Sequence, residues 1–147
     1  MGNKRYLSGV QGSSALAMKH AILLFSLLLC GSVAFAQEPE QHFYSNGRLE
    51  STRFNDGALD RFITYYESGR VKEMGAFLNG RRHGVWKQFD ENGTVMAEAC
   101  FSKGHRVGTW EFRDGTNALR GRLSYSDGRL MQGEQYDAGA LVAQRTY

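Results

Sequence analysis

An internal repeat of fixed period constrains this chain more than any other feature of its sequence. The stretch from Tyr65 to Gly115 carries the same anchors twice, always at an offset of 24 in the numbering: Gly69/Gly93, Val71/Val95, Phe77/Phe101, Gly80/Gly104, Gly84/Gly108 and Trp86/Trp110. A constant period of about 20–50 residues is typical of proteins in which each unit is one supersecondary element stacked on its neighbours. The period therefore predicts a repeat array.

Turn dipeptides indicate that the repeated element is a β-hairpin. Asn-Gly or Asp-Gly pairs tolerate the positive φ of tight hairpin turns, and they recur at 46–47, 56–57, 79–80, 92–93, 114–115 and 127–128. The segments between them have strand character: 61–66, 70–78, 85–89, 94–102 and 109–113. No stretch shows a sustained helical period. The sequence predicts an all-β fold.

Alternation within these segments predicts two different faces. Along 95–102, one face would carry Val95, Ala97, Ala99 and Phe101, and the other face would carry the residues between them. A hairpin cannot bury an aromatic face by itself, so neighbouring units must supply the contacts. Gly84 and Gly108 precede the two tryptophans, which predicts a backbone that turns sharply or lies flat beneath an indole ring.

The repeat extends outward with less regularity. Downstream, Gly128, Tyr136 and Gly139 keep the spacing of Gly69, Phe77 and Gly80, while residues 116–124 fit least well. Upstream, the sequence places Ile63 at the tryptophan position and Tyr66 at the position of Phe89. Atypical end units are expected, because they must cap the array.

These motifs resemble the MORN-repeat variant of bacterial proteins. The resemblance rests on Tyr66-Glu-Ser-Gly69, Phe89-Asp-Glu-Asn-Gly93 and Asn79-Gly-Arg-Arg-His-Gly-Val-Trp86, and it spans roughly 44–147. Such proteins are often labelled YwqK-family antitoxin. The resemblance implies a single-layer antiparallel β-meander of stacked hairpins that recognises a protein or a membrane. This chain departs from the pattern between Trp110 and Phe112, where a residue is missing, and in the last unit, which lacks the tryptophan.

The first 36 residues have the organisation of a secretory leader. A basic start at Met18-Lys19-His20 precedes the apolar run 21–29, and Ala34-Phe35-Ala36 supplies a small-x-small cleavage site. The run is too short to span a bilayer, which needs about 20 apolar residues. The sequence thus predicts an upstream extension (1–17), a helical signal peptide (18–36), a linker (37–43) and a repeat domain (44–147). The mature protein would be periplasmic or secreted.

Cleavage after Ala36 changes the charge and the cysteine count. It removes three of the 18 basic residues and none of the 15 acids, so the mature chain is neutral. The basic pI then gives no reason to expect a nucleic-acid partner. Cys30 leaves with the leader, and Cys100 remains as a small strand residue or as the site of an intermolecular disulfide.

No catalytic or metal-binding pattern is visible in the mature chain. His83 and His105 lie at different positions of the repeat, and no His-x-x-His or Cys-x-x-Cys spacing supplies ligands. Cys100 has no flanking signature of a nucleophile. We therefore expect a non-enzymatic protein without a cofactor, a metal or a small-molecule substrate.

Two groups of residues are candidates for binding. The first is the large aromatic set expected in the repeat core and at a contact surface: Phe77, Trp86, Phe89, Phe101, Trp110 and Phe112. The second is a set of basic turns that could meet an anionic partner: Arg81, Arg82, His83, Lys103, His105 and Arg106. The sequence favours an exported module that binds another protein in the cell envelope. The alternatives are binding to an anionic membrane surface and antitoxin-like binding of a toxin.

Overall fold

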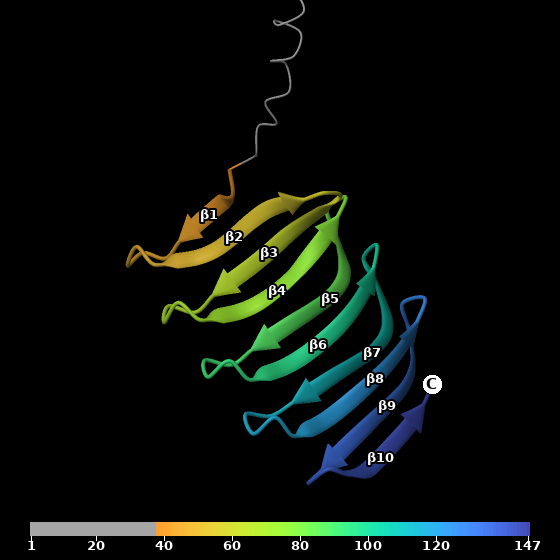
Figure 1. Ribbon diagram of the computed structural model, residues 1–147. Helices are drawn as coiled ribbons and strands as arrows, with labels where there is room; N and C mark the ends of the chain where they lie inside the picture. The colour runs from red at the N-terminus through yellow and green to blue at the C-terminus, as the bar shows by residue number, and fades with distance from the viewer. Residues whose placement is uncertain (1–37) are drawn as a thin grey trace, which may run out of the picture. The chain divides into compact units, whose positions relative to one another are not determined.

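The computed structural model describes residues 38–147, which form a single sheet of ten strands (Figure 1). The strands are β1 (Glu40–Phe43), β2 (Leu49–Asp56), β3 (Leu59–Tyr65), β4 (Val71–Leu78), β5 (Arg81–Phe89), β6 (Val95–Ser102), β7 (His105–Arg113), β8 (Leu119–Ser126), β9 (Arg129–Asp137) and β10 (Ala140–Thr146). The predicted leader (1–36), including its signal helix, lies outside the described residues. Residues 40–43 were expected in a linker, but they form β1 and pair with β2.

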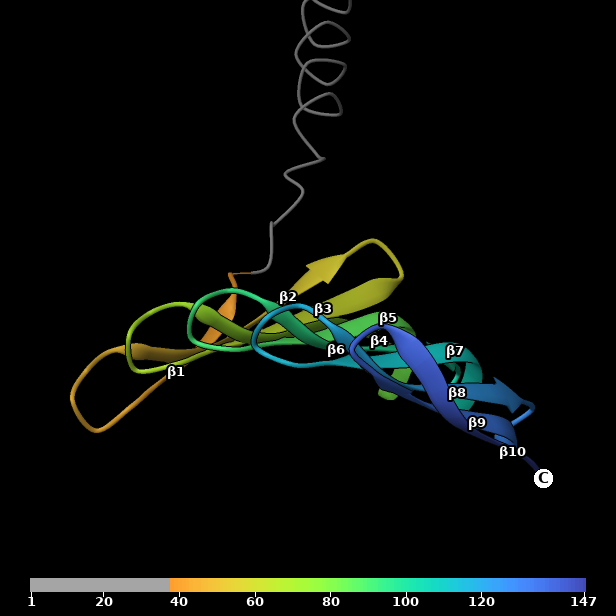
Figure 2. The same cartoon turned by 90° about the horizontal axis from the view of Figure 1, so that it is seen from below.

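The sheet is an antiparallel meander in which every strand pairs with its neighbours in the sequence. Its order runs from β1 to β10 without a crossover. Seen from below, the strands form one twisted layer, and no described element covers either face (Figure 2). The predicted all-β, single-layer meander is confirmed for residues 38–147, which contain no helix and thus none that could cross a membrane.

One edge of the sheet carries three-residue hairpin loops. Each loop after β3, β5 and β7 lies within a five-residue segment, 66–70, 90–94 or 114–118. The carbonyl of the first residue in the segment accepts a hydrogen bond from the amide of the fourth, and the amide of the first donates to the carbonyl of the fifth. In the second loop these bonds are Gly93 N to Asp90 O and Asp90 N to Thr94 O. The residue with positive φ is Gly69, Gly93 or Asn117. Such loops combine a type I turn with a left-handed residue. Asp114-Gly115 does lie in a turn, but Asn117 supplies its positive φ.

Aspartates close two of these loops. Oδ1 of Asp90 accepts hydrogen bonds from the amides of Asn92 and Thr94, and Oδ1 of Asp114 accepts them from the amides of Thr116 and Ala118. The Thr94 amide is the main cause of a lowered Asp90 pKa. The Thr116 hydroxyl and then Arg120 hold the pKa of Asp114 well below its usual range. Both carboxylates are thus favoured in their charged form.

The opposite edge carries two-residue turns. Asn79-Gly80, Lys103-Gly104 and Asp127-Gly128 have positive φ at both positions, as a type I′ turn requires. Each of the last two turns is tied to the preceding hairpin: the Gly104 amide donates to Arg82 O at 2.8 Å and the Gly128 amide to Arg106 O at 3.0 Å. The second bond repeats the first exactly one period later in the sequence.

A three-residue bulge contains each tryptophan as its last residue. Between the Met74–Lys87 and Ala76–His83 pairs, β4 contributes one residue and β5 contributes three. The same mismatch recurs one period later between β6 and β7. Gly84 and Gly108, with φ of 74° and 63°, begin the extra backbone. Because the strands continue through the bulges, β5 and β7 begin at 81 and 105, ahead of the predicted starts at 85 and 109.

The structure corrects the register predicted for the outer units. β4, β6 and β8 begin at 71, 95 and 119, so residues 116–124 belong to a regular unit. Tyr125 stands where Phe101 does, and Gly128 corresponds to Gly104, not to Gly69. No residue is missing after Trp110, because Phe112 stands at the position of Gln88. Upstream, the residue one period before Trp86 is Phe62, not Ile63.

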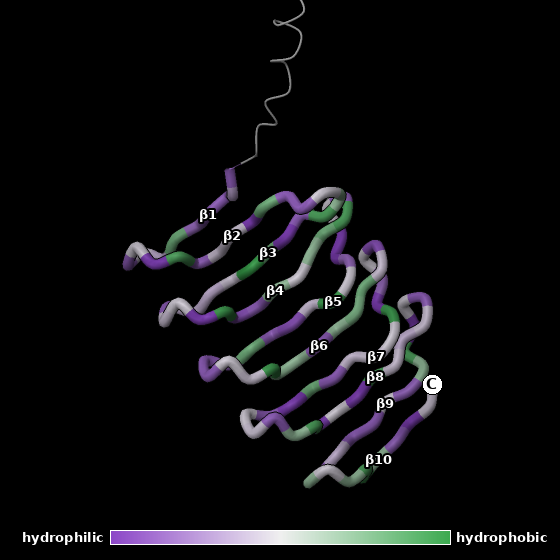
Figure 3. The backbone as a smooth tube through the Cα atoms, viewed as in Figure 1, coloured by the Kyte–Doolittle hydropathy of each residue, from purple (hydrophilic) through white to green (hydrophobic). Residues whose placement is uncertain are grey.

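Packing in the sheet is thin. Among the described residues, only Ala76 and Trp86 are buried, each with 3% exposure. Hydrophobic and hydrophilic residues are mixed along each strand, and no strand is hydrophobic throughout (Figure 3). Stability must therefore come from cross-strand pairs on two open faces.

Candidate functional site

Six aromatic side chains form a continuous row across one face of the sheet. Consecutive ring centroids lie between 5.0 and 6.4 Å apart, in edge or tilted arrangements. The row consists of Phe62, Phe77, Trp86, Phe101, Trp110 and Tyr125, each from one of the strands β3 to β8. We call this side the ring face. Aromatic pairs in such geometry contribute about 0.5–1.5 kcal/mol beyond their buried area.

The two tryptophans are fixed in the same way. Trp86 Nε1 donates to the Ala76 carbonyl at 3.1 Å, and Trp110 Nε1 donates to the Cys100 carbonyl at 3.0 Å. Donor and acceptor both shift by one full period between the two bonds. The bulge in each strand displaces the tryptophan relative to its partner strand, so that the indole reaches back over that strand.

The residue beneath each indole differs. At Gly75, an added Cβ would lie 2.2 Å from Cδ2 of Trp86, so the ring rests directly on the glycine backbone. The equivalent residue in the next unit is Ala99. Gly84 and Gly108 do not lie beneath an indole, which is one of the two roles that the sequence allows them, because a Cβ on either would meet no ring. Their role is the sharp backbone of the bulge.

Arginines cover the row. The guanidinium carbon of Arg82 lies 4.2 Å from the Trp86 ring centroid, and that of Arg106 lies 5.5 Å from the Trp110 centroid. Arg53 lies 5.3 Å from the Phe77 centroid. At such distances each cation–π contact contributes about 0.5–1 kcal/mol at an exposed site. Glu73 is 3.6 Å from Arg82, whereas no ion pair to Arg106 is found within residues 38–147.

Two of the predicted aromatic residues lie outside the row. Phe112 pairs with Ala97 on the ring face and is 38% exposed. Phe89 lies at the end of β5, where its carbonyl accepts a hydrogen bond from the Tyr66 hydroxyl at 2.7 Å. Phe62 and Tyr125 are not among the residues predicted from the sequence, although a strict step of one period from Trp86 and Phe101 identifies both.

The predicted basic turns do not gather into one cluster. Arg82 and Arg106 lie on the ring face, and the residues beside them alternate to the other face. His83 Nδ1 accepts a weak bond from the Lys103 amide at 3.3 Å, and the stem of Arg81 lies against Gly104. His105 approaches Gly128 across the next turn.

The other face carries a charged row. Lys87 pairs with Glu98 at 2.9 Å, and Arg122 lies 3.0 Å from Glu111 and 3.4 Å from Glu134. Arg113 and then Arg122 lower the pKa of Glu111. These ions pair across adjacent strands and leave the rings to the opposite side.

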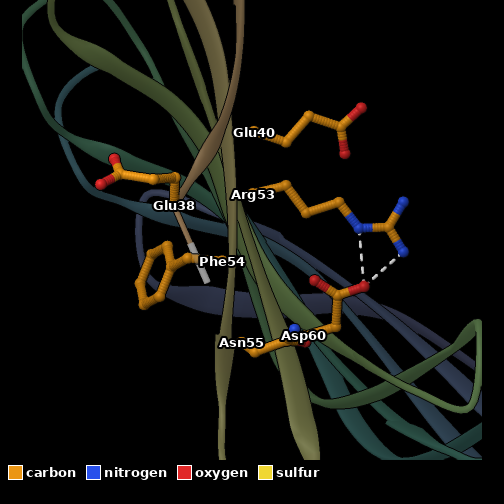
Figure 4. A pocket seen from close by; sticks show the side chains of 6 residues that line it. All are labelled: Glu38, Glu40, Arg53, Phe54, Asn55 and Asp60. Atoms are coloured by element: carbon orange, nitrogen blue, oxygen red, sulfur yellow. Dashed lines mark hydrogen bonds and ion pairs between the residues drawn. The ribbon is translucent and has the colours of Figure 1, made fainter. Parts of the chain in front are cut away.

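A further hollow lies at the first strands of the sheet. A hollow of about 220 Å³ beside β1 to β3 is lined by Arg53 and Asp60, which already pair, and Phe54 points the other way (Figure 4). Within residues 38–147, no three metal-ligating side chains lie together. Cys100 is half-buried and is not in a disulfide.

One family of known repeats is similar to part of this chain. A family model described as "MORN repeat variant" matches residues 82–103, which extend from β5 through β6 into the following turn. Residues 82–103 are therefore similar to a MORN repeat variant. The MORN match includes the bulge at Trp86 and the small residues Ala97 and Ala99 of β6. It does not extend to the YwqK-family antitoxin label or to a bacterial type, which remain predictions.

Solved structures show only a partial likeness. A crystal structure of an S. aureus TarM mutant in complex with fondaparinux, α-GlcNAc-glycerol and UDP is 12% identical, and a crystal structure of TarM is 11% identical. Each match has a TM-score of 0.46 and covers 83% of this chain but 24% of the other. The chain thus spans about a quarter of those proteins, and the likeness carries no argument about this one. A search of curated proteins found no match.

Proposed function

We propose that this chain is an exported, non-enzymatic repeat module that binds another protein in the cell envelope through its ring face. The observation that carries the proposal is the six-ring row on an open sheet. Aromatic residues and arginines are enriched in protein interfaces. The MORN repeat variant match supports a binding module.

Site-specific photocrosslinking tests the binding face. A photoreactive phenylalanine analogue replaces Phe112, which is exposed on the ring face, or the exposed Thr109, which lies on the other face. Position 112 should give a discrete crosslinked protein in the native host, and position 109 should not. Equal crosslinking from both positions, or none from 112, would contradict the proposal.

The leader sequence supports the export part of the proposal. Mass spectrometry of the N-terminus of protein from the native host should give a chain that begins at Gln37. A retained leader would refute export without affecting the binding face.

The distribution of basic side chains gives less support to a membrane-binding role. A flat anionic surface contacts one face at a time, whereas these side chains alternate between faces. Flotation with phosphatidylserine vesicles tests this alternative directly. A lipid-binding chain should float with the vesicles and should no longer do so when Arg81, Arg82 and Arg106 are changed to Glu, whereas a chain that binds only protein should not float in either form.

A further inference from the structure

Two adjoining hollows on the ring face form one groove. The first has a volume of about 230 Å³ and lies between Trp86 and Trp110; the second has about 350 Å³ and lies near Tyr66 and Phe89. Glu73 and Gln88 line both hollows. Because the hollows succeed one another along β5 and β6, the groove follows the strand direction.

Small side chains make the first hollow. Ala97 and Ala99 of β6 form its floor, while Trp86 of β5 and Trp110 of β7 rise on either side. One unit earlier the corresponding space is closed, since the indole of Trp86 itself lies on Gly75. Ala99 has a Cβ where Gly75 has none, so the space between the tryptophans stays open.

A bulge shapes the second hollow. Between the Gln88–Ala97 and Phe89–Val95 pairs, Met96 is an extra residue of β6. It joins the wall of the second hollow together with Glu73 and Gln88, which are residues of the ring face. The simple alternation predicted for 95–102 therefore fails at Val95 and Met96 and holds from Ala97 onward.

The groove has one cation in each hollow and polar groups in its middle, and the carboxylate of Asp90 at the second hollow is already held by loop amides. Lys72 stands 5.6 Å from the Tyr66 ring centroid in the second hollow, and Arg82 stands over Trp86 in the first. Among the described residues, the exposed Gln88 amide makes no side-chain hydrogen bond, and the Glu73 carboxylate has only Arg82 at 3.6 Å. The middle can thus exchange hydrogen bonds with a main chain.

We propose that this groove binds an extended peptide segment with two apolar side chains at alternate positions and acidic residues outside them. Alternate side chains of an extended chain lie on one side, so two of them can enter the two successive hollows from one face. Gln88 and Glu73 meet the peptide backbone between the anchors, and Lys72 and Arg82 meet the flanking carboxylates. This inference rests on protein binding by the ring face and specifies the chemistry of the partner.

The test uses a phage library of random heptapeptides selected on the full chain. Phage that bind the Ala99→Leu variant, in which leucine fills the first hollow, are removed beforehand. We expect enriched peptides with apolar residues at alternate positions next to Asp or Glu. A synthetic peptide of that pattern should bind at least tenfold more weakly to Ala99→Leu, as measured by fluorescence polarisation.

Two further variants keep the test decisive. Ala143→Leu makes the same change at an exposed position of β10 outside the groove and should bind like the parent chain. Lys72→Glu changes an exposed side chain and should leave folding intact. It should weaken the binding of acidic peptides severalfold. No enrichment, enrichment of basic peptides, or equal binding to Ala99→Leu would overturn the proposal.

Other occupants would give different results. Dimerisation of the chain that Ala99→Leu abolishes would assign the groove to a second copy, and vesicle binding that Lys72→Glu abolishes would assign it to lipid; either result overturns the proposal. A crosslinked partner at position 112 without peptide enrichment refutes the groove alone. The absence of both refutes the proposed function as well.

Discussion

The Trp86 and Trp110 units share one design and differ by one methyl group at its centre. Both have the bulge, the glycine that starts it, and an indole that donates to the carbonyl of the partner strand. Trp86 lies on Gly75 and is 3% exposed. Trp110 faces Ala99 in the equivalent place and is only half-buried.

This difference separates stability from recognition within one repeat array. Where the partner strand has glycine, the ring closes the surface and contributes packing. Where it has alanine, the ring stands beside an open hollow that a ligand can fill. If the proposed groove binds a peptide, one small residue changes a repeat from a structural unit to a binding unit.

Removing an indole should give the largest loss of stability, and the loss should differ between the two tryptophans. Trp86→Ala should cost about 3–5 kcal/mol, as truncation of buried aromatic residues does. Trp110→Ala should cost roughly half as much, because its ring keeps solvent contact. Urea unfolding followed by circular dichroism measures both. Equal losses would refute the contrast in packing.

Exchanging the residues beneath the rings should have the second-largest effect on stability. Gly75→Ala inserts a Cβ into the space of the Trp86 ring, and overpacking of this kind costs about 1–3 kcal/mol. The fluorescence of Trp86 should shift to longer wavelength as the ring leaves its site. The reciprocal variant Ala99→Gly should lose only about 0.5–1 kcal/mol, the usual effect of glycine in a strand.

Neutralising the covering arginines should have a smaller effect. Arg82→Gln should cost about 1 kcal/mol and Arg106→Gln about 0.5 kcal/mol, since Arg82 lies closer to its indole. Chemical unfolding at constant salt detects the difference, with Arg129→Gln at the exposed start of β9 as the control. A larger loss at Arg106 would contradict the ranking by distance.

The loop aspartates should stabilise the fold at neutral pH and lose this contribution in acid. The folded pKa values of Asp90 and Asp114 lie below their ordinary value, so the stability they contribute is present above the unfolded pKa and is lost as pH falls through the folded one. Asp90→Asn and Asp114→Asn should each flatten the decline in stability below about pH 4. Acid titration of unfolding would show it, and a steeper decline would be the wrong sign.

The period predicted most of the fold. Hairpin turns and β-propensity located the central strands, because these signals are local in sequence. The outer units were misplaced where spacing was matched to familiar residues and not to the fixed period. Asn117 stands where Gly69 and Gly93 do, and its left-handed φ of 65° gives no glycine signal. β3 lacks the bulge that contains the tryptophan in β5 and in β7, so the first unit is shorter.

The groove could not be predicted from residue types alone. Gly75 is ordinary in sequence, and its role follows from the displacement of Trp86 by the bulge. Gln88 and Glu73 become neighbours through strand register, which a one-residue shift would undo. The basic turns were grouped by closeness in sequence, whereas alternation sends adjacent side chains to opposite faces.

The uninterrupted strand order also governs how the chain assembles. Because each strand pairs only with the strands before and after it, no ordering step must bring distant parts of the polypeptide together, and low contact order favours rapid folding. Melting can begin at either outer strand and proceed hairpin by hairpin toward the middle. The tryptophan units, which lie farthest from both ends of the sheet, are then the last to open, and the groove lies in the most persistent part of the molecule.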